Sequence, residues 1–247
     1  MTEKERTLIA KTHEHFGTCL TNEMLKNDLQ KLGVSSGMTL LVHCSLSKIG
    51  WICGGPVTVI QVLLDLLGPE GTLIMPSHTS DNSDPKYWVN PPVPSEWLDV
   101  IRKSMPPYQP DIAPTRYMGI LAETFRKWPC VLRSEHPQHS MMALGVKHGN
   151  NTSLHLAEYR FFINNNFKKN FLTGASIINR QTNTRQWFEW NDYDHTADDF
   201  NDIGNAFEAI EGNANIGNVG LAPSRLMKQY LVVDFALQWM NKNRTKQ

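Results

Sequence analysis

A histidine inside a predicted helix is the first candidate for chemistry. In the run NNTSLHLAEYR a helical pattern begins near Thr152, His155 lies one turn into it, and Glu158 follows three residues later. Imidazole is the side chain whose ordinary pKa best suits proton abstraction near neutral pH, and it needs a carboxylate or carbonyl to fix its tautomer. His155 is therefore a candidate general base. The alternative interpretation is a half-buried histidine bonded to a carbonyl.

The stretch EWNDYDHTADDFND gathers six carboxylates in a chain whose 24 basic and 24 acidic residues otherwise balance. They are Glu189, Asp192, Asp194, Asp198, Asp199 and Asp202. Such a cluster repels itself, so it either faces water near a helix N-terminus or binds a cation. Helix capping accounts for Asp198 and Asp199, whereas Asp192 and Asp194 precede the helix. A solvated surface and a site for a polycationic ligand both remain open.

A third candidate follows the first predicted strand. In LVHCSLSKIGWICGG, the polar residues His43, Ser45 and Ser47 come after an apolar core and before a glycine-rich turn that leads into a helix. Ligands of open α/β sheets bind beyond the carboxyl ends of the strands, and helix N-termini attract anions. The pattern favours a phosphate-bearing cofactor, although it is neither a P-loop nor a dinucleotide fingerprint. Hydroxyls that cap the turn are the alternative interpretation.

Zinc and cysteine chemistry are disfavoured. Four histidines, His136, His139, His148 and His155, lie within twenty residues, but their turn-rich contexts give no reason for them to converge on one ion. A zinc-dependent hydrolase is thus an outside hypothesis, and we expect no metal. Cys44 adjoins His43, but neighbouring residues of a strand point to opposite faces.

Alternating helical and strand patterns predict an α/β fold that positions these residues. Helices are expected at about 22–32 and 56–67, and buried strands in MTLLVHCS and GTLIMPS, an order that implies a right-handed crossover between parallel strands. Residues 80–114 hold eight of the fourteen prolines and predict a long ordered loop with a short helix near 95–104. Further helices are expected near 117–127, from about 152, near 196–211 and over LVVDFALQWMNK, and strands near 140–146, 175–179 and 185–190. We expect one domain, 1–247, with three layers around a central, mostly parallel sheet.

Composition excludes several classes of protein. The 247 residues are 40% hydrophobic and 19% charged, which is typical of a globular chain. The zero net charge argues against general nucleic-acid binding, and no apolar run reaches the roughly 20 residues of a membrane span. Four cysteines without a CxxC motif form no disulfide framework. We therefore expect a soluble cytoplasmic protein that binds neither nucleic acid nor membrane; the sequence does not predict its oligomeric state.

Several long motifs, in the same order along the chain, resemble the aminoglycoside 3-N-acetyltransferase family. They are VHCSLSKIGWICGG, GTLIMPSHTSDNSDPKYWVNPPVPSEWLDVIRKSMPPY, PTRYMG, RSEHPQHS, NTSLHLAEYR, GNVGLAPSRLM and VVDFALQWM. The likeness is greatest to small bacterial members of uncertain substrate. One segment departs from the family, because members carry a few dozen residues that are missing here, where the two flanking ends are fused in HSMMALGVKHGNNTSLH.

The resemblance implies direct transfer of an acetyl group from acetyl-CoA, the cosubstrate, to the 3-amino group of a 2-deoxystreptamine aminoglycoside or a related amine. His155 matches the family's catalytic histidine, which Asp192 or Asp194 would orient. The residues implied to line the CoA channel are His43, Ser45, Ser47, Arg116, Met118 and Gly119. Those implied to face the cationic substrate are Asp84, Glu158 and Glu189. The missing segment raises an alternative, a catalytically impaired member that binds only CoA or retains only the fold.

Overall fold

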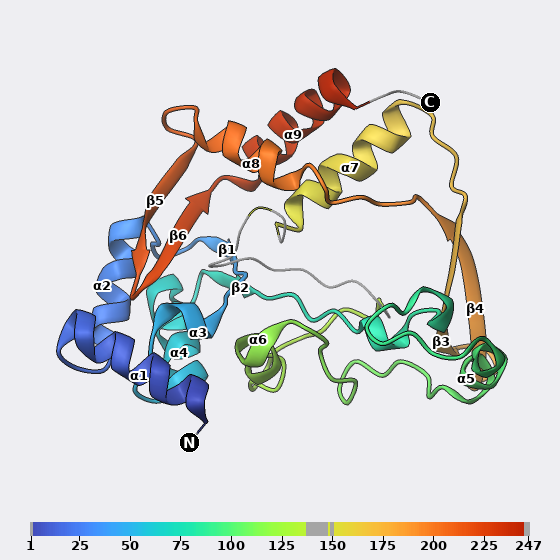
Figure 1. The fold of residues 1–247 in the computed structure, drawn as a ribbon, viewed down its shortest axis with the longest axis horizontal. Coiled ribbons are helices and arrows are strands. Elements are labelled where there is room, and N and C mark those ends of the chain that lie inside the picture. Colours follow the sequence, from blue (N-terminus) through green and yellow to red (C-terminus); the bar gives the residue numbers. More distant parts are fainter. Residues whose placement is uncertain (1, 137–147, 149–150, 245–247) are drawn as a thin grey trace.

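The computed structural model describes residues 2–136, 148 and 151–244 (Figure 1). Its first half contains α1 (Glu3–Phe16), α2 (Asn22–Leu32), β1 (Thr39–Leu41), α3 (Leu46–Ile49), α4 (Gly55–Leu67) and β2 (Thr72–Ile74). Helix α2 begins where the Thr21 side chain accepts a hydrogen bond from the Met24 amide, and it ends at Gly33, whose φ of 106° suits glycine. The predicted helices at 22–32 and 56–67 are confirmed.

Strands β1 and β2 pair in parallel, with Leu40 opposite Leu73, and α4 connects them. Buried side chains from α2, β1 and α4 form one hydrophobic core, which includes Leu25, Leu29, Leu40, Ile60 and Leu63. The predicted strand–helix–strand unit is therefore present. Its rigid core fixes the polar loop that follows β1.

The second half groups three helices around another core (Figure 1). These helices are α7 (Ser153–Asn164), α8 (Phe200–Glu208) and α9 (Gln229–Asn243). Their apolar faces bury Leu154, Phe161, Phe200, Ile203 and Met240, among others. Because α7 turns that face inward, the side chains at its N-terminal end are held in fixed positions. The expected helices from 152, near 196–211 and at the C-terminus are confirmed, with α8 shorter than expected.

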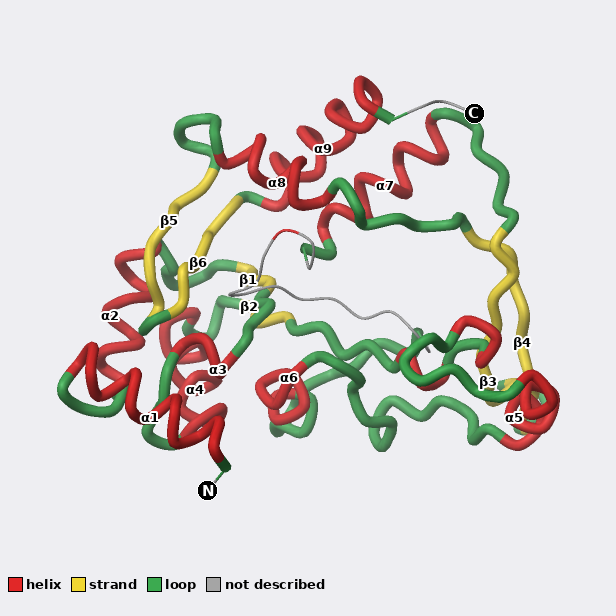
Figure 2. Tube along the Cα trace, in the orientation of Figure 1, coloured by secondary structure: helices red, strands yellow, loops and turns green. Residues whose placement is uncertain are grey.

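The strands of the described residues form three separate two-stranded sheets rather than one central sheet (Figure 2). Besides β1–β2, they are the antiparallel hairpins β3 (Phe171–Asn179) with β4 (Thr184–Asp192) and β5 (Ala214–Val219) with β6 (Ala222–Met227). The expectation of a central, mostly parallel sheet is thus wrong for the described part of the chain. Short turns let neighbouring strands pair locally and antiparallel, whereas parallel pairing needs a long crossover.

The proline-rich segment 80–114 contains three single-turn 3₁₀ helices, Ser80–Asn82, Pro85–Tyr87 and Ser95–Trp97, followed by α5 (Leu98–Ser104). Prolines remove backbone donors, so longer helices do not form there. The helix expected at 117–127 is α6 (Gly119–Phe125). The strand expected at 140–146 lies outside the described residues. Among the described helices, none combines the length and apolar character needed to cross a bilayer.

Candidate active site

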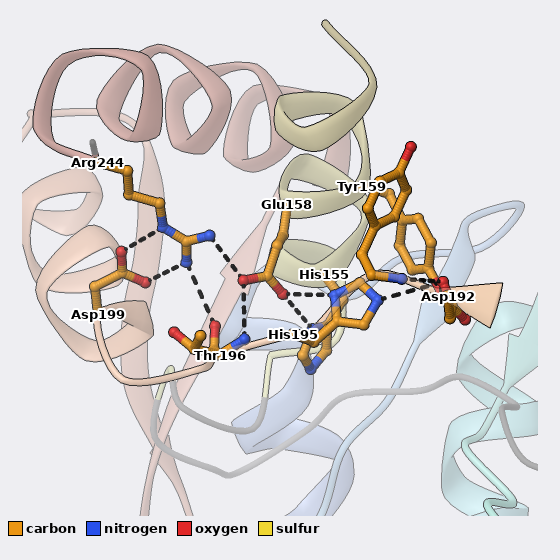
Figure 3. Close-up of polar contacts among 9 residues, drawn as sticks. His155, Glu158, Tyr159, Asp192, His195, Thr196, Asp199 and Arg244 are labelled. Carbon is orange, nitrogen blue, oxygen red and sulfur yellow. Dashed lines mark hydrogen bonds and ion pairs between the residues drawn. The ribbon is translucent and has the colours of Figure 1, made fainter. Parts of the chain in front are cut away.

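The N-terminal half of α7 presents His155 and Glu158 on one face, because residues three apart on a helix are neighbours. Glu158 is fully buried. Its Oε2 lies 3.0 Å from Nδ1 of His155 and 3.0 Å from Nδ1 of His195, so both imidazole rings meet one carboxylate oxygen (Figure 3). An ionised carboxylate only accepts hydrogen bonds, so each histidine donates from Nδ1.

The second oxygen of Glu158 is held by Arg244, which lies just beyond the end of α9. Arg244 Nη1 donates to Oε1 at 2.7 Å, and the same guanidinium donates to both oxygens of Asp199 at 2.6 and 2.7 Å. The Thr196 amide adds a bond to Oε1 at 3.3 Å. Glu158 therefore has a hydrogen-bond donor on each side of its carboxylate.

These donors keep Glu158 ionised in spite of its burial. Burial raises the pKa of Glu158, but the hydrogen bonds from His155, His195 and Arg244 outweigh it and lower the pKa to about 2. The site thus contains a permanent buried anion near neutral pH, and both histidines lie against it.

His155 has the geometry of a general base. Its Nδ1–H is fixed by Glu158, and its ring packs edge-on against Phe200 with centroids 4.8 Å apart. The side chain is 41% exposed, and Nε2 has no hydrogen-bond partner among the described residues. A neutral imidazole held through Nδ1–H carries its lone pair on Nε2, which can accept a proton from a bound molecule.

The acid beside His155 is therefore Glu158, and not Asp192 or Asp194 as expected from the resemblance. Both oxygens of Asp192 accept from the Tyr159 hydroxyl, at 3.1 and 3.0 Å, and Asp194 is exposed. Glu158 itself was expected to face the substrate, but a fully buried carboxylate with four donors is enclosed by protein. The spacing of three residues on α7 is the local reason for this pairing.

The two other acids expected at the substrate differ in their surroundings. Asp84 is 4% exposed, and both its oxygens pair with Nη2 of Arg102, at 2.9 and 3.1 Å. Asp84 thus stabilises the proline-rich segment, in disagreement with the expectation that it faces a cationic substrate. Glu189 lies exposed on β4, where its Oε1 accepts from Trp187 Nε1 at 3.0 Å.

The motifs expected to bind CoA lie against one another, and His43 links them to the residue that precedes α7. His43 Nε2 lies 3.1 Å from the Thr152 hydroxyl, immediately before α7, and the Ser45 and Ser47 hydroxyls lie 3.5 Å apart. Met118 precedes α6, and a Cβ built on Gly119 would lie 3.9 Å from the Cys44 carbonyl oxygen. The PTRYMG motif therefore lies against the loop after β1.

The positive charge among the residues expected to bind CoA comes from Arg116 and not from His43. Burial, with a contribution from His78, lowers the pKa of His43 to about 3, so its imidazole is neutral near pH 7. Arg116 is 40% exposed and forms an ion pair with Asp81 at 3.3 Å. Burial also raises the pKa of the Cys44 thiol to about 12, which disfavours a thiolate nucleophile.

The structure brings in residues that sequence reasoning did not single out: His195, Arg244, Tyr159 and Thr196. His195 lies inside the acidic stretch, which was interpreted from its six carboxylates alone. Arg244 reaches Glu158 across 86 residues of sequence, and no local pattern links the two. A buried glutamate on an apolar helix face was the signal that a distant cation had to be present.

One group of metal-ligand type occurs among the described residues, and it is not the run of four histidines that was considered, and disfavoured, as a zinc site from the sequence. It consists of His155, Glu158 and His195, whose ligand atoms lie within 4.8 Å of one another. Of the run considered from sequence, His139 lies outside the described residues, and His148 instead hydrogen-bonds to Glu208 at 2.8 Å.

Comparison with known proteins assigns the family. The sequence profile of the aminoglycoside 3-N-acetyltransferase family matches residues 41–147 and 141–241. The chain is 40% identical to the SPbeta prophage-derived aminoglycoside N(3')-acetyltransferase-like protein YokD of Bacillus subtilis, over 92% of this chain and 94% of that protein. The chain belongs to the aminoglycoside 3-N-acetyltransferase family.

Solved structures agree with this assignment. The crystal structure of YokD from Bacillus subtilis has a TM-score of 0.88 at 37% identity, and covers 97% of this chain and 100% of that one. The aminoglycoside acetyltransferase AAC(3)-Xa has a TM-score of 0.82 at 25% identity, and covers 98% of this chain and 99% of that one. The described fold is therefore that of the family.

The comparisons also bear on the fused segment. The family profile matches two stretches of the chain, which overlap over residues 141–147. The alignment with YokD runs over 263 positions, more than the 247 residues of this chain, so this chain has gaps relative to that protein. The junction itself lies outside the described residues.

Proposed function

We propose that this protein transfers the acetyl group of acetyl-CoA to the 3-amino group of an aminoglycoside or a related amine, with His155 as the general base. The observation that carries this proposal is the pair of His155 and buried Glu158, in which His155 is partly exposed and its Nε2 has no hydrogen-bond partner among the described residues. Membership of the family supports acetyl transfer as the reaction class. The pair of His155 and Glu158 supports general-base catalysis as its mechanism.

The chemistry needs a base of this kind. An alkyl amine is largely protonated near pH 7, and nitrogen attacks a thioester carbonyl only through a free lone pair. The ammonium group first releases one proton to solvent, which gives the neutral amine. His155 Nε2 then takes a second proton from the nitrogen as that nitrogen forms a bond to the acetyl carbonyl carbon. The tetrahedral intermediate then expels the CoA thiolate, which takes up the proton held on Nε2. Glu158 stabilises the transient imidazolium through Nδ1–H.

The cosubstrate side is assigned to the residues between β1 and α6. The Ser45 and Ser47 hydroxyls and the backbone amides of this loop are donors for the thioester oxygen, which gains charge in the transition state. Arg116 supplies positive charge for CoA phosphates. Neutral His43 with Met118 and Gly119 completes the channel lining. The contact of His43 with Thr152 supports this assignment, because it joins the channel to the first turn of the helix that bears His155.

The acceptor side is assigned to the exposed carboxylates near β4. Glu189 and Asp194 are exposed, and no hydrophobic pocket is needed to concentrate a polycation near them. Asp192 is partly exposed at the end of the same strand. The substrate class that these acids favour is a small molecule with several ammonium groups.

The experiment is a calorimetric titration of the purified protein with acetyl-CoA, followed in the same cell by kanamycin, with thiol release measured in parallel. We expect binding of both ligands, stoichiometric release of CoA, and a product whose NMR spectrum shows acetylation at the 3-amino group. Binding of acetyl-CoA without thiol release for any of a panel of aminoglycosides would overturn the proposal. It would favour the impaired member that the missing segment suggests.

A further inference from the structure

We propose that His155, Glu158 and His195 form a binding site for one Zn²⁺ ion, and that the bound ion switches off the general base. Two imidazoles and one glutamate are a known ligand set for zinc in proteins. The first part of this proposal stands on geometry alone. The second part rests on the function proposed for His155.

The ligand atoms already converge. Nδ1 of His155 and Nδ1 of His195 each lie 3.0 Å from Glu158 Oε2, and all three lie within 4.8 Å of one another. Tetrahedral zinc with bonds of about 2.0–2.1 Å requires its ligand atoms to be about 3.3 Å apart. Small rotations of the two partly exposed rings would therefore meet this requirement. Arg244 occupies Oε1, so Glu158 would bind through Oε2 alone.

A buried ring nitrogen that lacks a hydrogen bond points to the same site. Nε2 of His195 is buried and makes no hydrogen bond to any described residue, and it lies 4.0 Å from Asp192 Oδ1. A histidine that binds metal through one ring nitrogen typically donates its other N–H to a carboxylate. Coordination through Nδ1 would place the proton of His195 on Nε2, facing Asp192. Zinc would thus give the unpaired nitrogen both a proton and an acceptor.

The surrounding charge also suits a divalent cation. Glu158, Asp192 and Asp199 contribute three negative charges, and the single cation of Arg244 is shared between Glu158, at 2.7 Å, and Asp199, at 2.6 Å. The Tyr159 hydroxyl donates to Asp192 and fixes that carboxylate beside His195. An incoming Zn²⁺ therefore meets carboxylates that together carry two more negative charges than Arg244 supplies, at a site partly withdrawn from water.

Zinc at this position has a definite consequence for catalysis. Coordination at Nδ1 moves the proton of neutral His155 to Nε2, which removes the lone pair that the proposed mechanism uses. No proton is gained or lost, because only the tautomer changes. Zinc should therefore inhibit acetyl transfer without blocking the channel lined by His43 and Ser45, and a chelator should restore activity.

The test is a titration of the metal-free protein with Co²⁺ and with Zn²⁺, in the absence of acetyl-CoA and aminoglycoside. We expect one ion per chain, an intense visible absorption of tetrahedral Co²⁺, and its loss when Zn²⁺ is added. Asp192→Asn should weaken binding about 10–100-fold, as loss of a partner to a bound histidine does, and His195→Ala should weaken it more. The matched control is His15→Ala, an exposed histidine on α1, which should leave binding unchanged.

Wild-type protein that takes up no stoichiometric metal, or His195→Ala protein that binds as tightly as wild type, would overturn the site. The cobalt spectrum of wild-type protein decides the question even if a variant fails to fold. Activity is measured separately with a chelator present. Acetyl transfer in that assay without metal uptake would contradict only the zinc proposal, and metal uptake without acetyl transfer would contradict only the proposed function.

Discussion

Replacement of Arg244 by methionine should destabilise the protein by about 3 kcal/mol. Methionine keeps an unbranched apolar stem but removes the cation. The fully buried Glu158 and the partly buried Asp199 then lose their shared partner. Breaking a buried ion pair on one side costs about 3–5 kcal/mol. The lower end applies because His155 and His195 still donate to Glu158. The Arg244 side chain is only 15% exposed, so water replaces little of what is lost.

The assay is urea unfolding followed by circular dichroism, in which the midpoint should fall while the slope with denaturant stays constant. Arg160→Met is the matched control, since Arg160 pairs with Asp234 at 3.4 Å and the two side chains are 49% and 59% exposed. Exposed pairs contribute about 0–1 kcal/mol. Equal losses in the two variants would refute the reasoning that burial makes Arg244 a main support of the site.

Two further predictions concern the remainder of the fold. Because burial lowers the pKa of His43 to about 3, the unfolded chain binds a proton between about pH 6.5 and 3 that the folded chain does not, so stability falls as pH decreases through this window. The measurement is the free energy of unfolding at several pH values. His43→Gln should reduce the slope of this free energy against pH by up to about 1.4 kcal/mol per pH unit within the window. An unchanged slope would contradict the prediction. Gly204→Ala should cost about 1–3 kcal/mol in thermal unfolding, because its Cβ would lie 1.8 Å from His148 Cγ. Gly217→Ala is the control, because its Cβ would lie at an ordinary contact distance of 3.5 Å from Leu32, and it should hardly change the stability. Equal losses of stability in the two variants would contradict the prediction for Gly204.

Local patterns were sufficient to predict the strand–helix–strand unit and α7. Leu40 and Leu41 lie in a continuous apolar run, and α4 has a regular apolar stripe that ends at a glycine. The Thr152 boundary and the helical spacing of His155 and Glu158 also follow from neighbouring residues. Such features depend on interactions within a few turns, so a single sequence carries them.

Features that depend on distant contacts, or on weak local signals, were missed. Helix α1 buries only Thr12, so it has almost no apolar periodicity, although Thr2 and Glu5 form a capping box. The β5–β6 hairpin was not predicted, because its strands contain Gly217 and Pro223, which are rare in strands. The choice between Glu158 and Asp192 as the partner of His155 depends on Arg244 and Tyr159, which approach from other elements.

The most direct test of the central claim is the steady-state rate of acetyl-CoA-dependent thiol release for His155→Gln, with a wild-type comparison and a chelator present. General-base catalysis contributes about 10²–10⁴-fold, so we expect kcat to fall by this factor while acetyl-CoA binding stays within a few-fold of wild type. Glu158→Gln should fall in the same direction, because it removes the anion that fixes the His155 tautomer. A His155→Gln variant that keeps kcat within a few-fold of wild type would contradict the assignment of His155 as the base.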